Sequence, residues 1–398
     1  MSSDTAWPPV TWESHAWSST IPAELLSRRV RDRHQGPYLA AVAPAIARQD
    51  VRLPTDVLAA ADAATVEIAR FDTVVGADLT PFGAILLRTE SASSSRIENL
   101  TSGAKAIALA EIGGTDQRNA VEIVGNVRAM RTALSLDSAI DEHLLLQMHA
   151  ALMVHDRESA GRWRSQQVWI GGDDVGPHGA VFVAPHHDRV PGSIDDLLAF
   201  IRRDDIPALA HTALAHAQFE TIHPFTDGNG RTGRALMHAM LRSKGVTEQA
   251  TVPIAAGLLS RVDDYFAALT AYRDGDPAPI VHQVAEATFT ALGNARLLVE
   301  DIHHIRERWE SAIRARRGSA SWRLLDVALR QPVFDAATAA TALGITDSNA
   351  VRAINPLVES GVLTEFTGMR RNRLWQAREV LDALDDFARR AGKRTYGN

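Results

Sequence analysis

The sequence of 398 residues contains no cysteine, so disulfides, thiolate catalysis and cysteine-ligated zinc sites are all excluded. No apolar stretch approaches the roughly 20 residues that a membrane-spanning helix requires. The first twenty residues also lack the basic start and the apolar run of a secretory signal. We therefore expect a soluble, cytoplasmic protein without a membrane partner.

A large excess of positive charge is missing as well. The formal net charge is −6 and the isoelectric point is about 6.2. These values argue against a protein coated in nucleic acid, although one small basic face is compatible with the average. Hydrophobic residues make up 45% of the chain and charged residues 23%, as in ordinary globular proteins. The length predicts two or three packing units.

Helical periodicity dominates most of the sequence after an irregular stretch at residues 1–35. Alanine and leucine recur at helical spacing. The expected helices span 37–50, 54–71, 91–100, 104–134, 138–154 and 193–219, with further helices from about 231 to about 316. In the helix at 91–100 the serines offer N-caps, and Glu98 and Asn99 lie near its end.

Two glycine and proline clusters interrupt the helical pattern at 169–191. They flank the β-prone segment AVFVA at 180–184, which predicts a β-hairpin or flap.

A second kind of unit begins near Ser319. Three short helical segments precede two β-prone stretches joined by a glycine turn, and a helical tail follows. This order is typical of a winged helix. We therefore expect a mainly α protein with an N-terminal helical region (1–100), a core (101–316) and a winged-helix domain (317–398).

The sequence HPFTDGNGRTGR at 223–234 gives the strongest indication of chemistry. Gly228 and Gly230 permit positive φ, and such a run can aim successive backbone N–H groups at one anion. A helix that begins near Arg231 adds its N-terminal donors and its dipole. Arg231 and Arg234 share a helix face, and two guanidinium groups beside an anion nest suit a polyphosphate.

Two further side chains of this loop predict what the site does with the anion. Asp227 would repel a phosphate unless a cation such as Mg²⁺ intervened, so it is the candidate metal ligand. His223, with a reference pKa of about 6.5, can accept a proton near neutrality. Beside a phosphate nest, its natural task is to deprotonate an attacking hydroxyl.

This segment resembles, position by position, the Fic family signature His-Pro-Phe-x-Asp-Gly-Asn-Gly-Arg-x-x-Arg. The similarity extends through FETIHPF, GRWR (161–164), WIGG (169–172) and AVFVAP, and it covers about residues 35 to 300. A C-terminal winged helix is a frequent companion in this family. The resemblance therefore implies a Fic-type helical core with a β-hairpin flap.

Fic proteins usually transfer AMP from ATP to a hydroxyl of a target protein and release pyrophosphate. The resemblance implies this activity here, with ATP as substrate, Mg²⁺ as cofactor, and modification of the protein itself as well as of a target. It makes His223 the base that activates a Ser, Thr or Tyr hydroxyl. Asp227 would hold the metal, and Arg234 would bind the γ-phosphate. The residues that it assigns to ATP and phosphate binding are Asp227, Gly228, Asn229, Gly230, Arg231, Thr232, Arg234 and Tyr265.

The resemblance also gives roles to residues outside the loop. Val181, Phe182 and Val183 of the flap would present a strand edge to the target, because main-chain pairing positions a segment without reading much of its sequence. An ordinary surface hairpin is the alternative. Tyr265 falls where relatives have an aromatic residue near the adenine, although an aromatic at helical spacing also fits a core. Arg273 occupies a place where some relatives carry asparagine, which leaves a nucleotide contact there open.

Residues 94–99 resemble the inhibitory helix of autoinhibited Fic proteins, Ser/Thr-x-x-x-Glu-Gly/Asn. The resemblance makes Ser94, Glu98 and Asn99 inhibitory residues. A carboxylate paired with Arg234 would occupy the guanidinium that the γ-phosphate needs and would repel that phosphate. Some relatives use the same glutamate to remove AMP from targets, and this second activity stays open.

The expected winged helix leaves two kinds of partner open. Arg370, Arg371 and Arg373 in the wing would reach DNA phosphates. The expected recognition helix contains a single basic residue, Arg352, and Pro356 interrupts it. These features favour protein docking or a homodimer over DNA.

Two other classes of function also fit parts of the sequence. A winged-helix transcriptional regulator would sense nucleotide through the same core, although a pure sensor needs neither His223 nor Asp227. A metal hydrolase would use histidines, but His211 and His216 are five residues apart and do not share a helix face as a zinc pair does. The consecutive histidine pairs, interpreted as surface residues without ligand spacing, are His186–His187 and His303–His304.

Overall fold

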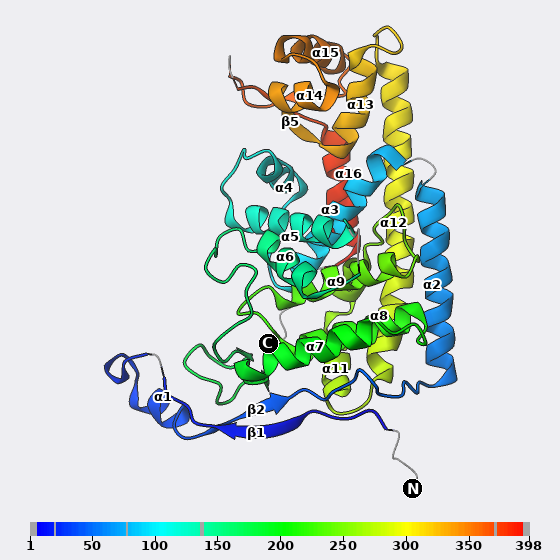
Figure 1. The fold of residues 1–398 in the computed structure, drawn as a ribbon. Helices are drawn as coiled ribbons and strands as arrows, with labels where there is room; N and C mark the ends of the chain where they lie inside the picture. The colour runs from blue at the N-terminus through cyan, green and yellow to red at the C-terminus, as the bar shows by residue number, and fades with distance from the viewer. Residues whose placement is uncertain (1–5, 20, 77–78, 136–138, 370–371, 393–398) are drawn as a thin grey trace. The chain divides into compact units, whose positions relative to one another are not determined.

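The structure is a computed structural model that describes residues 6–19, 21–76, 79–135, 139–369 and 372–392. Helices dominate it (Figure 1), which confirms the predicted mainly α class. The chain forms two compact units, each assembled from separate stretches. Unit 1 takes residues 1–62, 132–243 and 263–284, and unit 2 takes 63–131, 244–262 and 285–398. The predicted three-region division stays a prediction.

The elements of the described residues run in the following order. The α-helices are α1 (Arg28–Arg33), α2 (Thr55–Gly76), α3 (Leu79–Ile97), α4 (Ala104–Glu111), α5 (Arg118–Leu134), α6 (Glu142–Leu152), α7 (Val190–Ile201), α8 (Ala208–Ile222), α9 (Asn229–Ser243), α10 (Ile254–Ser260), α11 (Val262–Arg273), α12 (Ala278–Ala312), α13 (Ala320–Arg330), α14 (Ala336–Leu343), α15 (Asp347–Glu359) and α16 (Arg378–Arg390). The strands are β1 (Thr11–His15), β2 (Tyr38–Val42), β3 (Trp169–Ile170), β4 (Phe182–Val183), β5 (Val333–Asp335), β6 (Thr364–Glu365) and β7 (Leu374–Gln376). Two short 3₁₀ helices are η1 (Ala23–Leu25) and η2 (His187–Arg189).

The predicted helix over 37–50 is wrong, and so is the irregular interpretation of residues 1–35. Residues 38–42 form β2, which pairs antiparallel with β1, and Tyr38 lies opposite His15. Tyr38 and Ala40 bury their side chains against Val183 of the flap strand. Pairing and burial here outweigh the weak helical preference of alanine, because propensity differs by less than about 1 kcal/mol per residue.

The predicted flap is present in unit 1. Strands β3 and β4 pair antiparallel, with Trp169 opposite Val183 and Ile170 opposite Phe182. In the same unit, α8 packs against α7 and α9 (Figure 1). Every residue of α8 from 209 to 222 is buried, which explains why it shows little amphipathic pattern.

The helix predicted at 91–100 is the end of a much longer one. Helix α3 begins at Leu79, so the serines are not N-caps, and Ser94 and Ser95 are fully buried inside it. Its end agrees with the prediction, because Asn99 has φ +64° and the N–H of Leu100 donates to the Ser95 carbonyl at 3.0 Å. A left-handed residue of this kind commonly ends a helix, and asparagine tolerates it.

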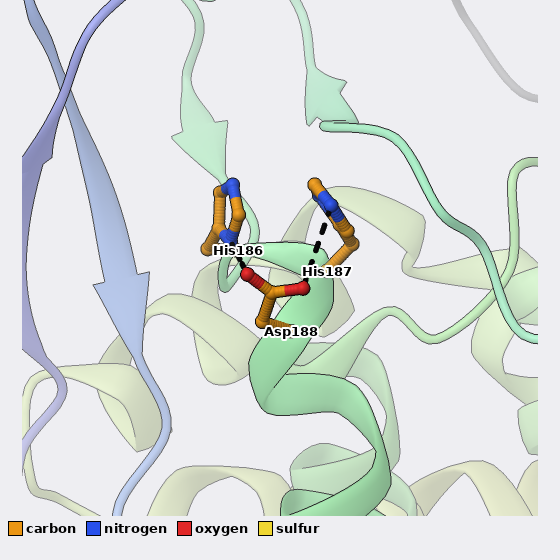
Figure 2. Close-up of side chains that lie close together, drawn as sticks. All are labelled: His186, His187 and Asp188. Carbon is orange, nitrogen blue, oxygen red and sulfur yellow. Dashed lines mark ion pairs between the residues drawn. The ribbon is translucent and has the colours of Figure 1, made fainter.

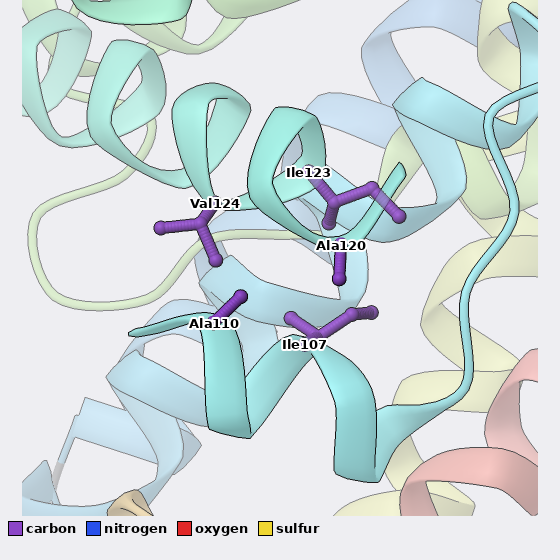
Figure 3. Close-up of a cluster of buried hydrophobic side chains, with 5 residues drawn as sticks. All are labelled: Ile107, Ala110, Ala120, Ile123 and Val124. Carbon is purple, nitrogen blue, oxygen red and sulfur yellow. The ribbon is translucent and has the colours of Figure 1, made fainter. Parts of the chain in front are cut away.

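Unit 2 is held together by apolar clusters and by buried carboxylates that accept backbone hydrogen bonds. One cluster joins α4 to α5 (Figure 3); its buried members are Ile107, Ala110, Ala120, Ile123 and Val124. The Asp72 carboxylate accepts from the backbone N–H groups of residues 248–250, at 2.6 to 3.2 Å. Glu90 of α3 likewise accepts from the N–H of Ala255 at 2.9 Å.

The predicted C-terminal elements are also present in unit 2. Helices α13, α14 and α15 contact one another, and β7 pairs with both β6 and β5. Strand β5 was not predicted, because three residues are too few for a recognisable alternation. Pro356 does not interrupt α15, which continues to Glu359. Arg373 lies over the Trp375 ring at 5.0 Å, and Arg370 and Arg371 fall outside the described residues.

Within the described part of the chain, no helix has the length and apolar character needed to cross a membrane.

A close backbone approach in unit 2 yields a stability prediction. A Cβ added at Gly257 of α10 would come within 1.9 Å of the Ala287 carbonyl oxygen of α12. We expect Gly257→Ala to destabilise the protein by about 1–3 kcal/mol or more, because backbone must move. Gly293→Ala is the matched control, since its added Cβ meets open space and should stabilise α12 by up to about 1 kcal/mol. Urea unfolding of both variants measures the difference, and equal midpoints would contradict the packing described.

Candidate active site

The predicted phosphate loop joins α8 to α9 in unit 1, and its first residue has an unusual backbone. His223 caps the C-terminus of α8 with φ +50° and ψ +59°, and its N–H donates to the Phe219 carbonyl at 2.9 Å. A non-glycine residue in this left-handed region costs free energy unless its surroundings hold it. The neighbouring contacts show how it is held.

Arg164 provides the main restraint on His223. Its Nε donates to the His223 carbonyl at 2.8 Å, and one Nη donates to the carbonyls of Pro185 and Ile222 at 2.5 and 3.4 Å. Its own N–H donates to the Pro224 carbonyl at 3.0 Å. The side chain is buried, and burial lowers the pKa of Arg164 to about 10, which still leaves it charged at neutrality. One guanidinium therefore ties the end of α8 to the base of the flap.

His149 of α6 fixes the middle of the loop. Its Nδ1 accepts the N–H of Gly161 at 3.0 Å, so Nε2 carries the proton and donates to the Asp227 carbonyl at 3.1 Å. The ring stacks on Phe225, with centroids 3.7 Å apart and planes 6° apart. Burial is the main cause that lowers the pKa of His149 to about 4. The neutral imidazole of His149 thus stabilises the loop through its hydrogen bond to Asp227 and its stacking on Phe225.

The end of the loop is closed by Asn229 and Gly228. The Asn229 amide accepts from the N–H of Phe225 at 2.8 Å and donates to its carbonyl at 2.9 Å. Gly228 has φ +76°, and a Cβ there would come within 2.7 Å of a Leu152 methyl, so only glycine fits. Gly230 was expected to share this freedom, but it lies in the first turn of α9.

The first turn of α9 follows directly after Gly228 of the loop. The N-terminus of a helix favours an anion because of its backbone N–H groups and its dipole. Arg231 is buried and donates to the Asp227 carboxylate at 3.2 Å, whereas the Asp227 side chain is 67% exposed. Thr232 and Arg234, both buried, follow in the same helix. The loop therefore has exposed carboxylate oxygens at the N-terminus of α9, and one of them accepts from the N–H of Gly228 at 2.6 Å.

The electrostatic surroundings keep His223 in the form of a base. Burial lowers the pKa of His223 to about 3, and the positive charges of Arg273 and Arg164 lower it further in the same direction. Arg273 lies over the ring of Phe182 at 3.9 Å and donates to the Glu220 carbonyl at 3.4 Å. The imidazole of His223 is partly exposed. It is thus neutral at physiological pH and reachable by a proton donor.

Tyr265 and the three flap residues, which were also predicted to contact ATP or the target, differ in how far they are exposed. Tyr265 is buried, and its hydroxyl lies 2.8 Å from Nε2 of His216, so its predicted place beside the adenine stays a prediction. In the flap, Val181 is 80% exposed while Phe182 and Val183 are buried. A single exposed side chain is thus available for the predicted target contact, and that contact also stays a prediction.

The histidines of α8 offer no common metal site. His211 bonds through Nε2 to the Phe200 carbonyl at 2.9 Å, and His216 bonds to Tyr265. Within the residues searched, the one group with metal-ligand spacing is elsewhere, at His186, His187 and Asp188. Our interpretation of that pair as lacking ligand spacing is therefore wrong. Of the second pair, His303 packs against the Phe82 ring, and His304 is 69% exposed.

The predicted inhibitory residues all lie in unit 2 at the end of α3. Ser94 is buried, Glu98 is half-buried and Asn99 is exposed. Arg234 belongs to unit 1. The pairing of Glu98 with Arg234 therefore stays a prediction.

Sequence reasoning missed three residues that shape this site. Arg164 was noted as part of a resembling segment, but nothing in the segment indicated that it binds the carbonyl of His223. His149 lies in α6 without a recognisable motif around it. Arg273 was noted only as a departure from relatives, whereas its charge lies close enough to lower the pKa of His223. All three act across long sequence separations, which a single sequence does not show.

Comparison with known proteins supports the loop assignment. Residues 139–241 match the model of the Fic/DOC family, so the chain contains a Fic/DOC domain. The chain is 32% identical over 180 residues to protein adenylyltransferase Fic of Nematostella vectensis and 28% identical over 186 residues to protein adenylyltransferase fic-1 of Caenorhabditis elegans. These alignments cover 45% and 44% of this chain but 38% and 33% of the relatives. The chain thus spans about a third of the length of the curated relatives that it matches.

A solved structure agrees on the fold. A Fic family protein from Desulfovibrio desulfuricans aligns with a TM-score of 0.55 over 82% of this chain and 97% of that one. The sequence identity is 24%, so the likeness establishes the fold alone. It confirms the predicted Fic-type helical core.

The buried histidines predict how stability depends on pH. Burial is the main cause that lowers the pKa of His149 to about 4 and that of His216 to about 3. Because unfolding returns each to about 6.5, the unfolded state binds protons first as pH falls below 6.5. Stability is therefore fully present above pH 6.5 and is lost towards pH 4 and 3. Lowering the pH from 8 to 5 should therefore reduce the free energy of unfolding by about 2 kcal/mol for each of these two histidines.

Urea unfolding at pH 8, 6.5 and 5 measures this loss. His216→Gln should flatten the pH dependence, because one titrating group is removed. The exposed His304 serves as control, and His304→Gln should leave the dependence unchanged. A wild-type stability that stays constant from pH 8 to pH 5 would show that these rings are not held neutral.

Proposed function

We propose that this chain is a protein adenylyltransferase that moves AMP from ATP to a Ser, Thr or Tyr hydroxyl of a target protein. The observation that carries the proposal is a neutral, partly exposed His223 at the start of the loop that leads into the N-terminus of α9. The names of the curated relatives agree with this activity. Because the chain covers only part of those relatives, the activity remains our proposal.

In the proposed reaction the hydroxyl gives its proton to the unprotonated nitrogen of His223. The hydroxyl oxygen then bonds to the α-phosphorus of ATP. The bond from that phosphorus to the oxygen bridging the α- and β-phosphates breaks, and pyrophosphate leaves with the electron pair. A neutral imidazole is the form that accepts a proton, which is the state that burial and the neighbouring arginines favour.

The phosphates would lie against the first turn of α9. The backbone of Gly228, Asn229 and Gly230 would form the cradle, since the Asn229 side chain is occupied by Phe225. Arg231 and Arg234 would add positive charge, with Arg234 at the γ-phosphate. Oriented N–H groups stabilise charge well in a site shielded from water. The N–H of Gly228 now donates to the Asp227 carboxylate at 2.6 Å and would exchange that partner for a phosphate oxygen.

Asp227 fits a magnesium ion because its carboxylate is an exposed oxygen ligand beside this cradle. Mg²⁺ in proteins is held by one or two carboxylates together with phosphate oxygens and water. When bound, it would neutralise charge on the α- and β-phosphates. Asp227 now pairs with Arg231, so ion binding would exchange that partner for the metal.

The proposed protein target would dock on the flap. Val181 is the exposed member of the predicted docking set, and Arg273 contacts the ring of its neighbour Phe182. The flap base is fixed through Pro185 and Arg164 to the carbonyl of His223. A target segment paired with the flap would thereby be held at a defined distance from the base. Self-modification, de-AMPylation, the homodimer, DNA binding and the cytoplasmic location stay predictions.

We also propose that Glu98 restrains the enzyme. Its position after the last turn of α3, next to the left-handed Asn99, agrees with the predicted inhibitory segment. A carboxylate at Arg234 would compete with the γ-phosphate for one guanidinium. A nucleotide-sensing regulator is less well supported, because a sensor does not require a neutral histidine beside the phosphate cradle.

Removal of the base tests the enzyme directly. His223→Ala should lower transfer of labelled AMP by roughly 10²–10⁴-fold while ATP still binds, because general-base catalysis supplies that factor. The measurements are label incorporation by mass spectrometry and nucleotide binding by calorimetry. His143→Ala is the control, since His143 is an exposed histidine of the same unit. Full transfer by the His223 variant would refute the assigned base.

Removal of the Glu98 carboxylate tests the proposed inhibition. Glu98→Gly should increase self-AMPylation, because the γ-phosphate gains access to Arg234. The protein is incubated with labelled ATP, UTP, GTP or CTP, and we expect AMP on the protein itself. Asp116→Gly, which removes an exposed carboxylate elsewhere in unit 2, should have no effect. An unchanged rate in the Glu98 variant would refute inhibition by Glu98, and it would leave the proposed role of His223 as base untouched.

A further inference from the structure

We propose that His186, His187 and Asp188 bind a divalent transition-metal ion, with Zn²⁺ as the type case, at the base of the flap in unit 1. This site is separate from Asp227, and it does not depend on the proposed transferase activity. Figure 2 shows the carboxylate of Asp188 between the two imidazoles.

The spacing of the ligand atoms fits a metal ion. Nδ1 of His186 lies 3.3 Å from one oxygen of Asp188, and Nε2 of His187 lies 3.6 Å from the other. Zinc bonds of about 2.0–2.1 Å in tetrahedral geometry place neighbouring ligand atoms roughly 3.3 Å apart. One ligand atom from each of the three residues lies within 4.8 Å of the others. Small side-chain rotations would complete the coordination.

The local backbone holds these side chains together. Pro185 follows two residues after the flap strand β4. His186 is extended with φ −55° and ψ +143°, and the 3₁₀ helix η2 starts at the next residue. The N–H of Arg189 closes this turn on the His186 carbonyl at 2.9 Å. As a result the imidazoles of His186 and His187 lie with centroids 4.0 Å apart. The Pro185 carbonyl is itself bound by Arg164, so the turn is anchored.

The charges around Asp188 favour a cation. The imidazoles of His186 and His187 flank its carboxylate, and neutral imidazoles are the form that ligates a metal. Arg189, the nearest cation along the chain, is already paired with Glu13. A divalent ion would balance the carboxylate.

The donor set selects the class of metal. Two imidazoles and one carboxylate suit zinc, cobalt, nickel, copper or iron, whereas magnesium and calcium prefer oxygen ligands alone. The side chains are 22%, 31% and 79% exposed for His186, His187 and Asp188. The remaining coordination positions therefore face solvent and would hold water. The ion would link the end of β4 to the start of α7.

Direct metal binding to the 398-residue chain tests this site. Tag-free protein is stripped of metal, and Zn²⁺ alone is titrated by calorimetry. Wild type should bind one ion per chain, and Zn²⁺ should raise its unfolding temperature. His187→Gln and Asp188→Asn should each weaken binding at least about 10-fold, the range lost on removing even outer contacts of a metal site. A large excess of Mg²⁺ should not displace the zinc.

His304→Gln is the matched control, because it removes an exposed histidine from the other consecutive pair and should leave binding unchanged. Unfolding without metal checks that each variant folds, and the conservative Asp188→Asn keeps the test valid if the histidine variant does not fold. A Co²⁺ titration should give the visible absorption of a cobalt–imidazole site in wild type alone. Equal binding by wild type and both site variants, or displacement by Mg²⁺, would overturn the proposal.

Discussion

The hydrogen bonds of the Arg164 guanidinium are the interaction on which the arrangement of the loop at 223–228 depends. This guanidinium is buried, it stays charged, and its donors reach the carbonyls of His223, Ile222 and Pro185. A buried cation is costly unless its hydrogen bonds are satisfied, and here they are satisfied by backbone that leaves regular structure. The left-handed turn at His223 and the buried charge thus stabilise each other, and the same side chain joins the flap to the loop.

Neutral imidazoles in this unit serve different purposes that depend on their surroundings. His149 uses both ring nitrogens in hydrogen bonds to backbone, so it supports the loop and has no free lone pair. His223 has an exposed edge and two neighbouring arginines that disfavour its cation. In both cases burial removes the charged form, but only at His223 does the lone pair remain available. Burial therefore keeps both rings neutral, one in a structural role and the other with a lone pair that the proposed reaction would use.

The sequence predicted the parts of the fold and site that are encoded locally. The glycine-bearing loop, the flap hairpin and the C-terminal helices all carry short-range patterns. The predictions were wrong where tertiary contacts determine the secondary structure. Residues 38–42 form a strand because they pair with residues 11–15. The serines at 91–95 lie inside a longer helix. The restraints from Arg164 and His149 could not be foreseen, because their partners are 59 and 78 positions away and their hydrogen bonds are mostly to backbone, which has no residue signature.

The interleaved construction of the two units bears on how such a domain can be inherited or transplanted. The segment that matches the Fic/DOC family, 139–241, lies entirely in unit 1, yet unit 1 also takes in the start of the chain and residues 263–284. Arg273, whose charge lowers the pKa of His223, comes from the last of these stretches. The recognisable signature is thus shorter than the body that makes it work, and a gene fragment cut at its edges would encode the motif without the scaffold.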